Sequence, residues 1–112
     1  MAQPTVRIDG RRITDWPSFH AIFAEAFGFP AFYGCNMDAW IDCLTSLDDP
    51  SSGMTKVHVK GDGALSLVIE HAAEFKQRCP EQFTALVECA AFVNWRRHEK
   101  GDSSVLAVAF YA

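Results

Sequence analysis

The chain has 112 residues, of which 49% are hydrophobic and 21% charged, and its formal net charge is −4. This length and composition predict one globular domain over residues 1–112, with a core large enough to fold without a metal or a disulfide. The negative charge argues against nonspecific binding to nucleic acid, because that requires Lys and Arg to displace counterions from phosphates.

The first segment predicts a strand followed by a helix. Apolar and polar residues alternate over residues 5–9, as in a short strand. A helix over residues 15–27 follows, because Thr14 or Asp15 can cap its start and apolar residues recur at helical spacing. Gly28 suits the end of that helix, since glycine readily adopts the left-handed conformation found there.

The middle of the chain predicts a second helix and a second strand. Asn36 is a good N-cap for a helix over residues 37–47. Residues 55–60 are expected to form a strand, followed by the Gly-Asp-Gly sequence at 61–63. This sequence lacks the Gly-Lys-Ser/Thr ending of a phosphate-binding loop, so we interpret it as a tight turn.

The last part predicts helices over residues 65–78 and 81–98 and a strand over 104–110. The unbroken apolar run 105–110 is typical of a strand that is buried on both faces or central in its sheet. The apolar face of the last helix is predicted to contain Phe83, Leu86, Val87, Ala90, Val93 and Trp95. Helices bridge every pair of strands, so we expect an α/β fold with three parallel strands, right-handed crossovers and about four helices.

Charge is distributed unevenly along the chain. The segment 13–55 contains no Lys or Arg but six acidic residues, which are Asp15, Glu25, Asp38, Asp42, Asp48 and Asp49. Asp38 and Asp42 are four residues apart and therefore share one helix face, where like charges repel. Three interpretations remain open for this pair: solvated surface charges, an acid/base pair, or a site for a positively charged partner. The absence of nearby basic residues favours the partner site.

The cysteines and histidines show no metal-ligand spacing, so we expect no metal and no cofactor. The four cysteines are expected to be free thiols, with Cys43 and Cys89 in the core. Cys35 precedes a helix start, where a thiol can become a nucleophile, but no orienting His lies near it in sequence. We therefore expect no enzyme activity. The sequence shows no signal peptide and no membrane-spanning run, so we expect a cytoplasmic protein.

The run 29–45, FPAFYGCNMDAWIDCLT, resembles the central motif of the barstar family, intracellular inhibitors of bacterial ribonucleases such as barnase. The Tyr-Gly-x-Asn-x-Asp-Ala-x-x-Asp core is long and unusual. The resemblance implies the family's three-stranded parallel sheet with helices. It also implies that the loop and the following helix block a ribonuclease active site, with acidic side chains in the places of RNA phosphates.

The partner-binding residues implied by the resemblance are Phe32, Tyr33, Gly34, Asn36, Met37, Asp38, Ile41 and Asp42. Asp42 resembles the principal inhibitory carboxylate and Asp38 the second. The chain departs from the family pattern at Cys35, at the reversed order of Trp40 and Ile41, and in the last helix, where Arg96, Arg97 and His98 stand near the positions expected to be acidic.

The expected partner is thus a basic protein, a ribonuclease or toxin nuclease encoded with this chain, and neither nucleic acid nor membrane. A barstar-like module that binds a basic protein other than a ribonuclease is the alternative. A small enzyme that uses Cys35 or the Asp pair is the third interpretation.

Overall fold

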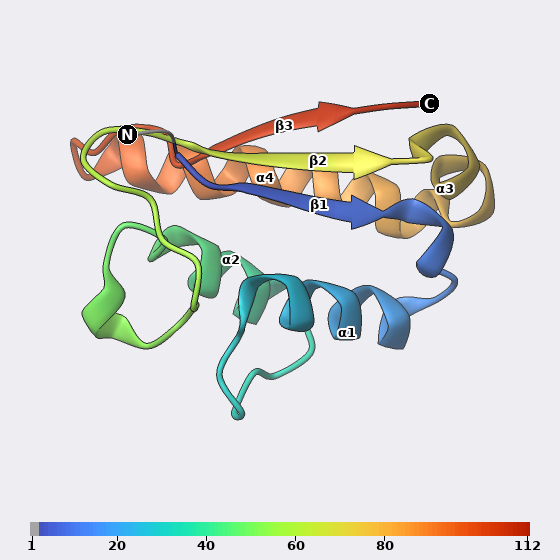
Figure 1. Cartoon of the computed structure of the whole chain (residues 1–112), viewed down its shortest axis with the longest axis horizontal. Helices are drawn as coiled ribbons and strands as arrows, with labels where there is room; N and C mark the ends of the chain where they lie inside the picture. The colour runs from blue at the N-terminus through green and yellow to red at the C-terminus, as the bar shows by residue number, and fades with distance from the viewer. Residues whose placement is uncertain (1–2) are drawn as a thin grey trace.

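The structure, a computed structural model, describes residues 3–112 and consists of one three-stranded sheet and four α-helices (Figure 1). In chain order the elements are β1 (Thr5–Asp9), the 3-10 helix η1 (Gly10–Arg12), α1 (Trp16–Phe27), α2 (Met37–Thr45), the 3-10 helix η2 (Pro50–Ser52), β2 (Leu65–Glu70), α3 (Ala72–Arg78), α4 (Pro80–Glu99) and β3 (Leu106–Phe110).

The sheet has the order β1-β2-β3, and both pairs of strands are parallel. The register aligns Val6 with Leu67 and Leu67 with Val108, so these three side chains share one face of the sheet. In Figure 1, α4 runs along the strands while α1 and α2 lie together on the side of β1. The predicted α/β fold with a parallel sheet is confirmed.

The core lies between the sheet and the helices and is rich in aromatic side chains. Phe19, Phe23 and Phe27 of α1 are fully buried, as is Trp40 of α2. The rings of Phe23 and Trp40 meet edge to face, with their centroids 5.7 Å apart. These contacts join α1 to α2 and fix where the segment between the two helices begins and ends.

The second strand lies at Leu65–Glu70, and the prediction of a strand at 55–60 was wrong. So was the prediction of a helix over 65–78, because only α3 (Ala72–Arg78) is helical there. The backbone of segment 55–60 bonds elsewhere: the Val59 amide donates to the Leu47 carbonyl, and the Gln3 side chain bonds the main chain of Lys60. Residues 61–63 form the predicted turn, since the Gly63 amide donates to the Lys60 carbonyl.

The last strand lies at an edge of the sheet, which corrects the expectation that it is central. β2 pairs with a strand on each side, whereas β3 pairs only with β2. Exposure follows this order, because Leu65, Leu67, Val68 and Ile69 of β2 are buried while most of β3 is partly or fully exposed. An apolar run in the sequence does not by itself distinguish a central strand from an edge strand.

The boundaries of α1 and α2 follow the local chemistry of the chain. The Asp15 side chain accepts a hydrogen bond from the Ser18 amide at the start of α1, and Gly28 ends this helix in the left-handed conformation. The Asn36 side chain accepts from the Ala39 amide at the start of α2. The predicted cap residues at both helix starts are confirmed.

The buried stripe of α4 differs in part from its predicted apolar face. Gln82, Leu86, Ala90, Val93 and Arg97 are buried, whereas Val87 and Trp95 are exposed. The fully apolar side chains of the stripe sit three or four residues apart and face the core. Val87 and Trp95 are 42% and 58% exposed, so the buried stripe is narrower than the predicted apolar face. Cys43 is buried as expected, and Cys89 is half-buried against the core.

None of the helices in residues 3–112 combines the length and the apolar character that crossing a membrane requires.

Candidate protein-binding face

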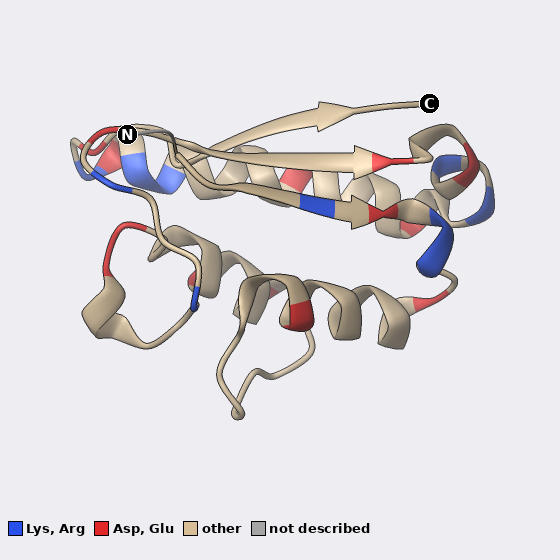
Figure 2. Ribbon diagram, in the orientation of Figure 1, with Lys and Arg blue, Asp and Glu red and all other residues tan. Residues whose placement is uncertain are grey.

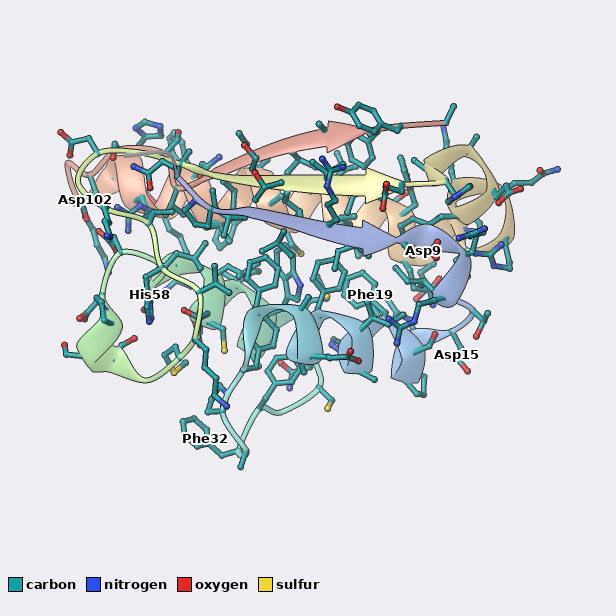
Figure 3. All side chains as sticks on the ribbon, in the orientation of Figure 1. Asp9, Asp15, Phe19, Phe32, His58 and Asp102 are labelled. Carbon is teal, nitrogen blue, oxygen red and sulfur yellow. The ribbon has the colours of Figure 1, made fainter. Side chains whose placement is uncertain are left out.

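The loop between α1 and α2 places one aromatic side chain in solvent. Phe32 is 77% exposed, the most exposed large hydrophobic side chain in the described part of the chain. In Figure 3 it lies at the end of the loop, directed away from the body of the molecule. A ring in this position can bury its area only against another molecule.

Tyr33 anchors the same loop to α1. Its hydroxyl lies 2.6 Å from Nδ1 of His20, and its ring packs against Phe29 with centroids 4.6 Å apart. Burial raises the pKa of Tyr33 above its ordinary value, so the phenol stays protonated at physiological pH. Desolvation also lowers the pKa of His20. A neutral imidazole can accept a hydrogen bond from the phenol hydroxyl, and this bond fixes the loop that presents Phe32.

Helix α2 presents Asp38 and Asp42 to solvent. Asp38 lies in the first turn of the helix, next to the amide groups that Asn36 leaves uncapped, so the helix dipole favours its negative charge. Asp42 lies one turn further along on the same face. Asp38 forms no ion pair with any residue in 3–112.

Asp42, in contrast, is paired with a cation from α4. Nη1 of Arg96 lies 2.9 Å from Oδ1 of Asp42, and the two side chains are 33% and 57% exposed. This contact corrects the expectation that no basic residue offsets the two carboxylates. The run without Lys or Arg in the sequence is not a region without cations in space, because α4 packs against α2.

A second arginine fastens α4 to the end of α2. The Arg97 guanidinium donates to both carboxylate oxygens of Asp48, each at 2.9 Å, and to the carbonyls of Thr45 and Ser103. Its hydrogen bonds lower the pKa of Asp48. Since Arg97 is only 5% exposed, this ion pair is structural, and it sets the position of the neighbouring Arg96.

The remaining predicted contact residues divide between surface and core. Gly34 and Asn36 are exposed, Met37 is half-buried, and the Asn36 amide also donates to the Gly34 carbonyl. Ile41 is only 8% exposed and packs in the core, so it offers little surface to a partner. Trp40 and Ile41, whose order is reversed relative to the family pattern, are both buried.

A shallow apolar groove adjoins the loop, between the first turns of α1 and the start of α2. It is lined by Trp16, His20, Cys35, Asn36 and Met37. Cys35 is exposed and has a positive φ of 52°, and among residues 3–112 its thiol hydrogen-bonds only to the Tyr33 carbonyl. Nδ1 of His20 is bonded to Tyr33, and no hydrogen bond joins Cys35 to His20 in these residues, whereas a thiol nucleophile needs a paired base.

No group of three His, Cys, Asp or Glu side chains within residues 3–112 is arranged to hold a metal ion. Figure 2 shows the charges of the two helical regions: the ribbon of α1 and α2 contains acidic residues and no basic ones, and the basic residues of α4 lie toward its C-terminal end. The face is therefore formed by a projecting aromatic ring, one free carboxylate and one carboxylate shared with an arginine.

Two residues of this face lie outside the loop and helix motif that the sequence indicates. Arg96 belongs to it only because α4 packs against α2, and His20 belongs to it only because the loop folds back onto α1. Two signals point to Arg96: the family resemblance marks its region of the last helix, and it precedes the buried Arg97 at the border of the buried stripe.

Comparison with known families gives one match. The model of the family described as "Barstar (barnase inhibitor)" matches residues 3–108, nearly the whole chain. The comparison with curated proteins returns no match.

Proposed function

Because the chain belongs to the barstar family, we propose that it inhibits a ribonuclease, by covering the cationic active site of that enzyme with helix α2 and the loop before it. The target is a basic protein, a ribonuclease or toxin nuclease encoded with this chain, and the complex forms in the cytoplasm. In this proposal the protein is an inhibitor and has no catalytic activity of its own.

The observation that supports this proposal best is the exposure of Phe32 and Asp38 on a rigid scaffold. Within the described residues, the Phe32 ring is mostly exposed and the Asp38 carboxylate forms no ion pair. A ribonuclease site must be cationic to hold phosphates, and carboxylates held by a helix can occupy it without being cleaved. The bond between Tyr33 and His20 holds the loop in place before binding, which lowers the entropy lost in the complex.

Charge complementarity also predicts how the complex forms. An acidic face attracts a basic enzyme over a distance of about 8–10 Å at moderate salt, and the attraction weakens as ionic strength rises. Association with the target should therefore slow when salt is added, while RNA itself should not bind. An association rate that does not respond to salt would argue against α2 as the docking element.

The test begins with a pull-down from the source organism using the tagged protein, followed by mass spectrometry. Each basic protein recovered is then assayed for RNA cleavage while the parent chain is added. The expected result is a ribonuclease whose activity falls to zero at one equivalent of inhibitor. A recovered partner that does not cleave RNA would support the alternative, a barstar-fold module that binds a different basic protein.

Substitutions on the face show whether it makes the contact. Asp38→Ala, Asp42→Ala and Phe32→Ala should each weaken binding. Removing one member of a buried interfacial ion pair costs about 2–5 kcal/mol, which is about thirty- to several-thousand-fold in affinity. Asp102→Ala is the matched control, because Asp102 is exposed and lies far from Phe32 in Figure 3. Equal affinity of all four variants would exclude this face.

A further inference from the structure

The ion pair between Arg96 and Asp42 leaves both side chains only partly satisfied. Nη1 of Arg96 donates the single hydrogen bond that this side chain makes to residues 3–112, and it goes to Oδ1 of Asp42 at 2.9 Å. Nε and Nη2 of Arg96 therefore remain available, and the side chain is one-third exposed. Oδ2 of Asp42 is likewise free to accept.

Arg96 lies on the side of α4 that faces α2. Cys89, Phe92 and Arg96 follow one another at intervals of three and four residues, so they form one stripe along the helix. Burial raises the pKa of the Cys89 thiol, and the negative charges of Glu88 and Asp38 add to this effect. Phe92, between Cys89 and Arg96 in the stripe, is 45% exposed. The face thus consists of the α2 carboxylates Asp38 and Asp42 and of the α4 stripe, which ends in the cation Arg96.

This arrangement makes the face bipolar. A cation of a partner can bind Asp42 only through Oδ2, because Arg96 is bonded to Oδ1. The positive charge of Arg96 then repels that cation. Like charges brought together in an interface oppose binding, and this opposition is a common source of specificity. A carboxylate that approaches Arg96 finds two free donors in the fork geometry that suits bidentate binding.

We propose that Arg96 is the specificity-determining residue of this face: the target presents an acidic side chain beside its basic groups, and a purely cationic site is bound weakly. The acidic group pairs with the free edge of the Arg96 guanidinium, and the neighbouring basic group pairs with Asp38 and with Oδ2 of Asp42. This inference rests on the proposed inhibitory function and defines the chemistry of its target.

The probe for this proposal is barnase, the enzyme named in the family description, because a site that holds RNA phosphates is cationic. Affinity for barnase is measured by calorimetry for the parent chain and for Arg96→Gln and Arg96→Glu. Arg7→Glu is the matched control, because it changes the net charge as much as Arg96→Glu does, at an exposed position on β1. Thermal melting of each variant confirms that it is folded.

Arg96→Glu should bind barnase at least about tenfold more tightly than the parent, which corresponds to about 1.4 kcal/mol. Arg96→Gln should fall between the two, and Arg7→Glu should stay within about twofold of the parent at moderate salt, since charges far from the interface are screened. The proposal is overturned if folded Arg96→Glu binds no more tightly than the parent, and also if neither form binds barnase at all.

The proposed function and this inference fail in different ways. If the parent inhibits a ribonuclease from its own source but Arg96→Glu gains nothing toward barnase, the inhibitor stands and the role of Arg96 falls. If Arg96→Glu gains affinity for barnase while the parent inhibits no ribonuclease, the role of Arg96 stands and the natural target is another basic protein.

Discussion

Arg97→Met should destabilise the protein far more than any change to its exposed neighbour Arg96. The parent guanidinium is almost fully buried and makes four hydrogen bonds, two of them to the Asp48 carboxylate. Methionine fills a similar volume with an apolar chain but leaves the carboxylate and two carbonyls without their donor. Removing one partner of a buried ion pair typically costs about 3–5 kcal/mol.

The structure places the expected loss near the lower end of that range. The Asp48 side chain is 35% exposed, so water can replace part of what Arg97 provides. We therefore expect a loss of about 3–4 kcal/mol from a free energy of unfolding that is about 5–15 kcal/mol for a typical domain. With an unfolding entropy of about 2.1 cal/mol/K per residue, the melting temperature should fall by about 12–17 °C.

Urea denaturation and thermal melting measured by circular dichroism would test this value. Arg96→Met is the control, because that arginine precedes Arg97 in the same helix but makes one hydrogen bond and is partly exposed. It should cost less than about 1 kcal/mol, as exposed ion pairs do. If the two variants lose the same stability, the argument that Arg97 fastens α4 to α2 is refuted.

Tyr33→Phe should lower the free energy of unfolding by about 1–2 kcal/mol, because it leaves the buried His20 nitrogen without its partner, whereas Tyr111→Phe, at an exposed ring, should be neutral in the same urea titration. Asp48→Asn should lower stability at neutral pH: the depressed pKa of Asp48 contributes stability above the unfolded pKa near 3.9, and this contribution disappears as the pH falls through the folded pKa. Melting curves of parent and variant should therefore begin to converge as the pH falls below about 3.9 and meet below the folded pKa of Asp48, and a constant difference would contradict the assignment. A thiol reagent should label Cys35 first in the native protein, because the other cysteines are buried or half-buried and burial raises the pKa of Cys43 to about 11; bound target should slow that labelling, and unchanged labelling would place the target elsewhere.

The fold was predictable where local chemistry and tertiary structure agree. The caps at Asp15 and Asn36 and the glycine at position 28 each satisfy the helix end they adjoin, so the boundaries of α1 and the start of α2 were found correctly. The second strand was missed for a physical reason. Segment 55–60 has residues suited to a strand, but in the folded chain its main chain bonds Phe27 at the end of α1, Leu47 just after α2 and the Gln3 side chain instead.

The break between β2 and α3 could not be read from residue types. It occurs at His71, which adopts a positive φ of 54° although it is not glycine, and the sequence gives no sign of this. The candidate site was predictable as far as the loop and helix motif reached, including Phe32, Asp38 and Asp42. The charge balance of the site was not, because Arg96 lies far from Asp42 in sequence and meets it only through helix packing.

The order of the strands also determines when the chain can fold. The central strand β2 comes from the middle of the sequence, and its two neighbours come from opposite ends, as the pairs Thr5–Ser66 and Leu65–Leu106 show. No hairpin can form first, so both ladders require the closure of long loops, a feature associated with slow folding. During synthesis, β2 therefore has one unpaired edge until β3 has been synthesised and can pair with it. A chain shortened before Leu106 would keep that apolar edge open and would be prone to aggregate.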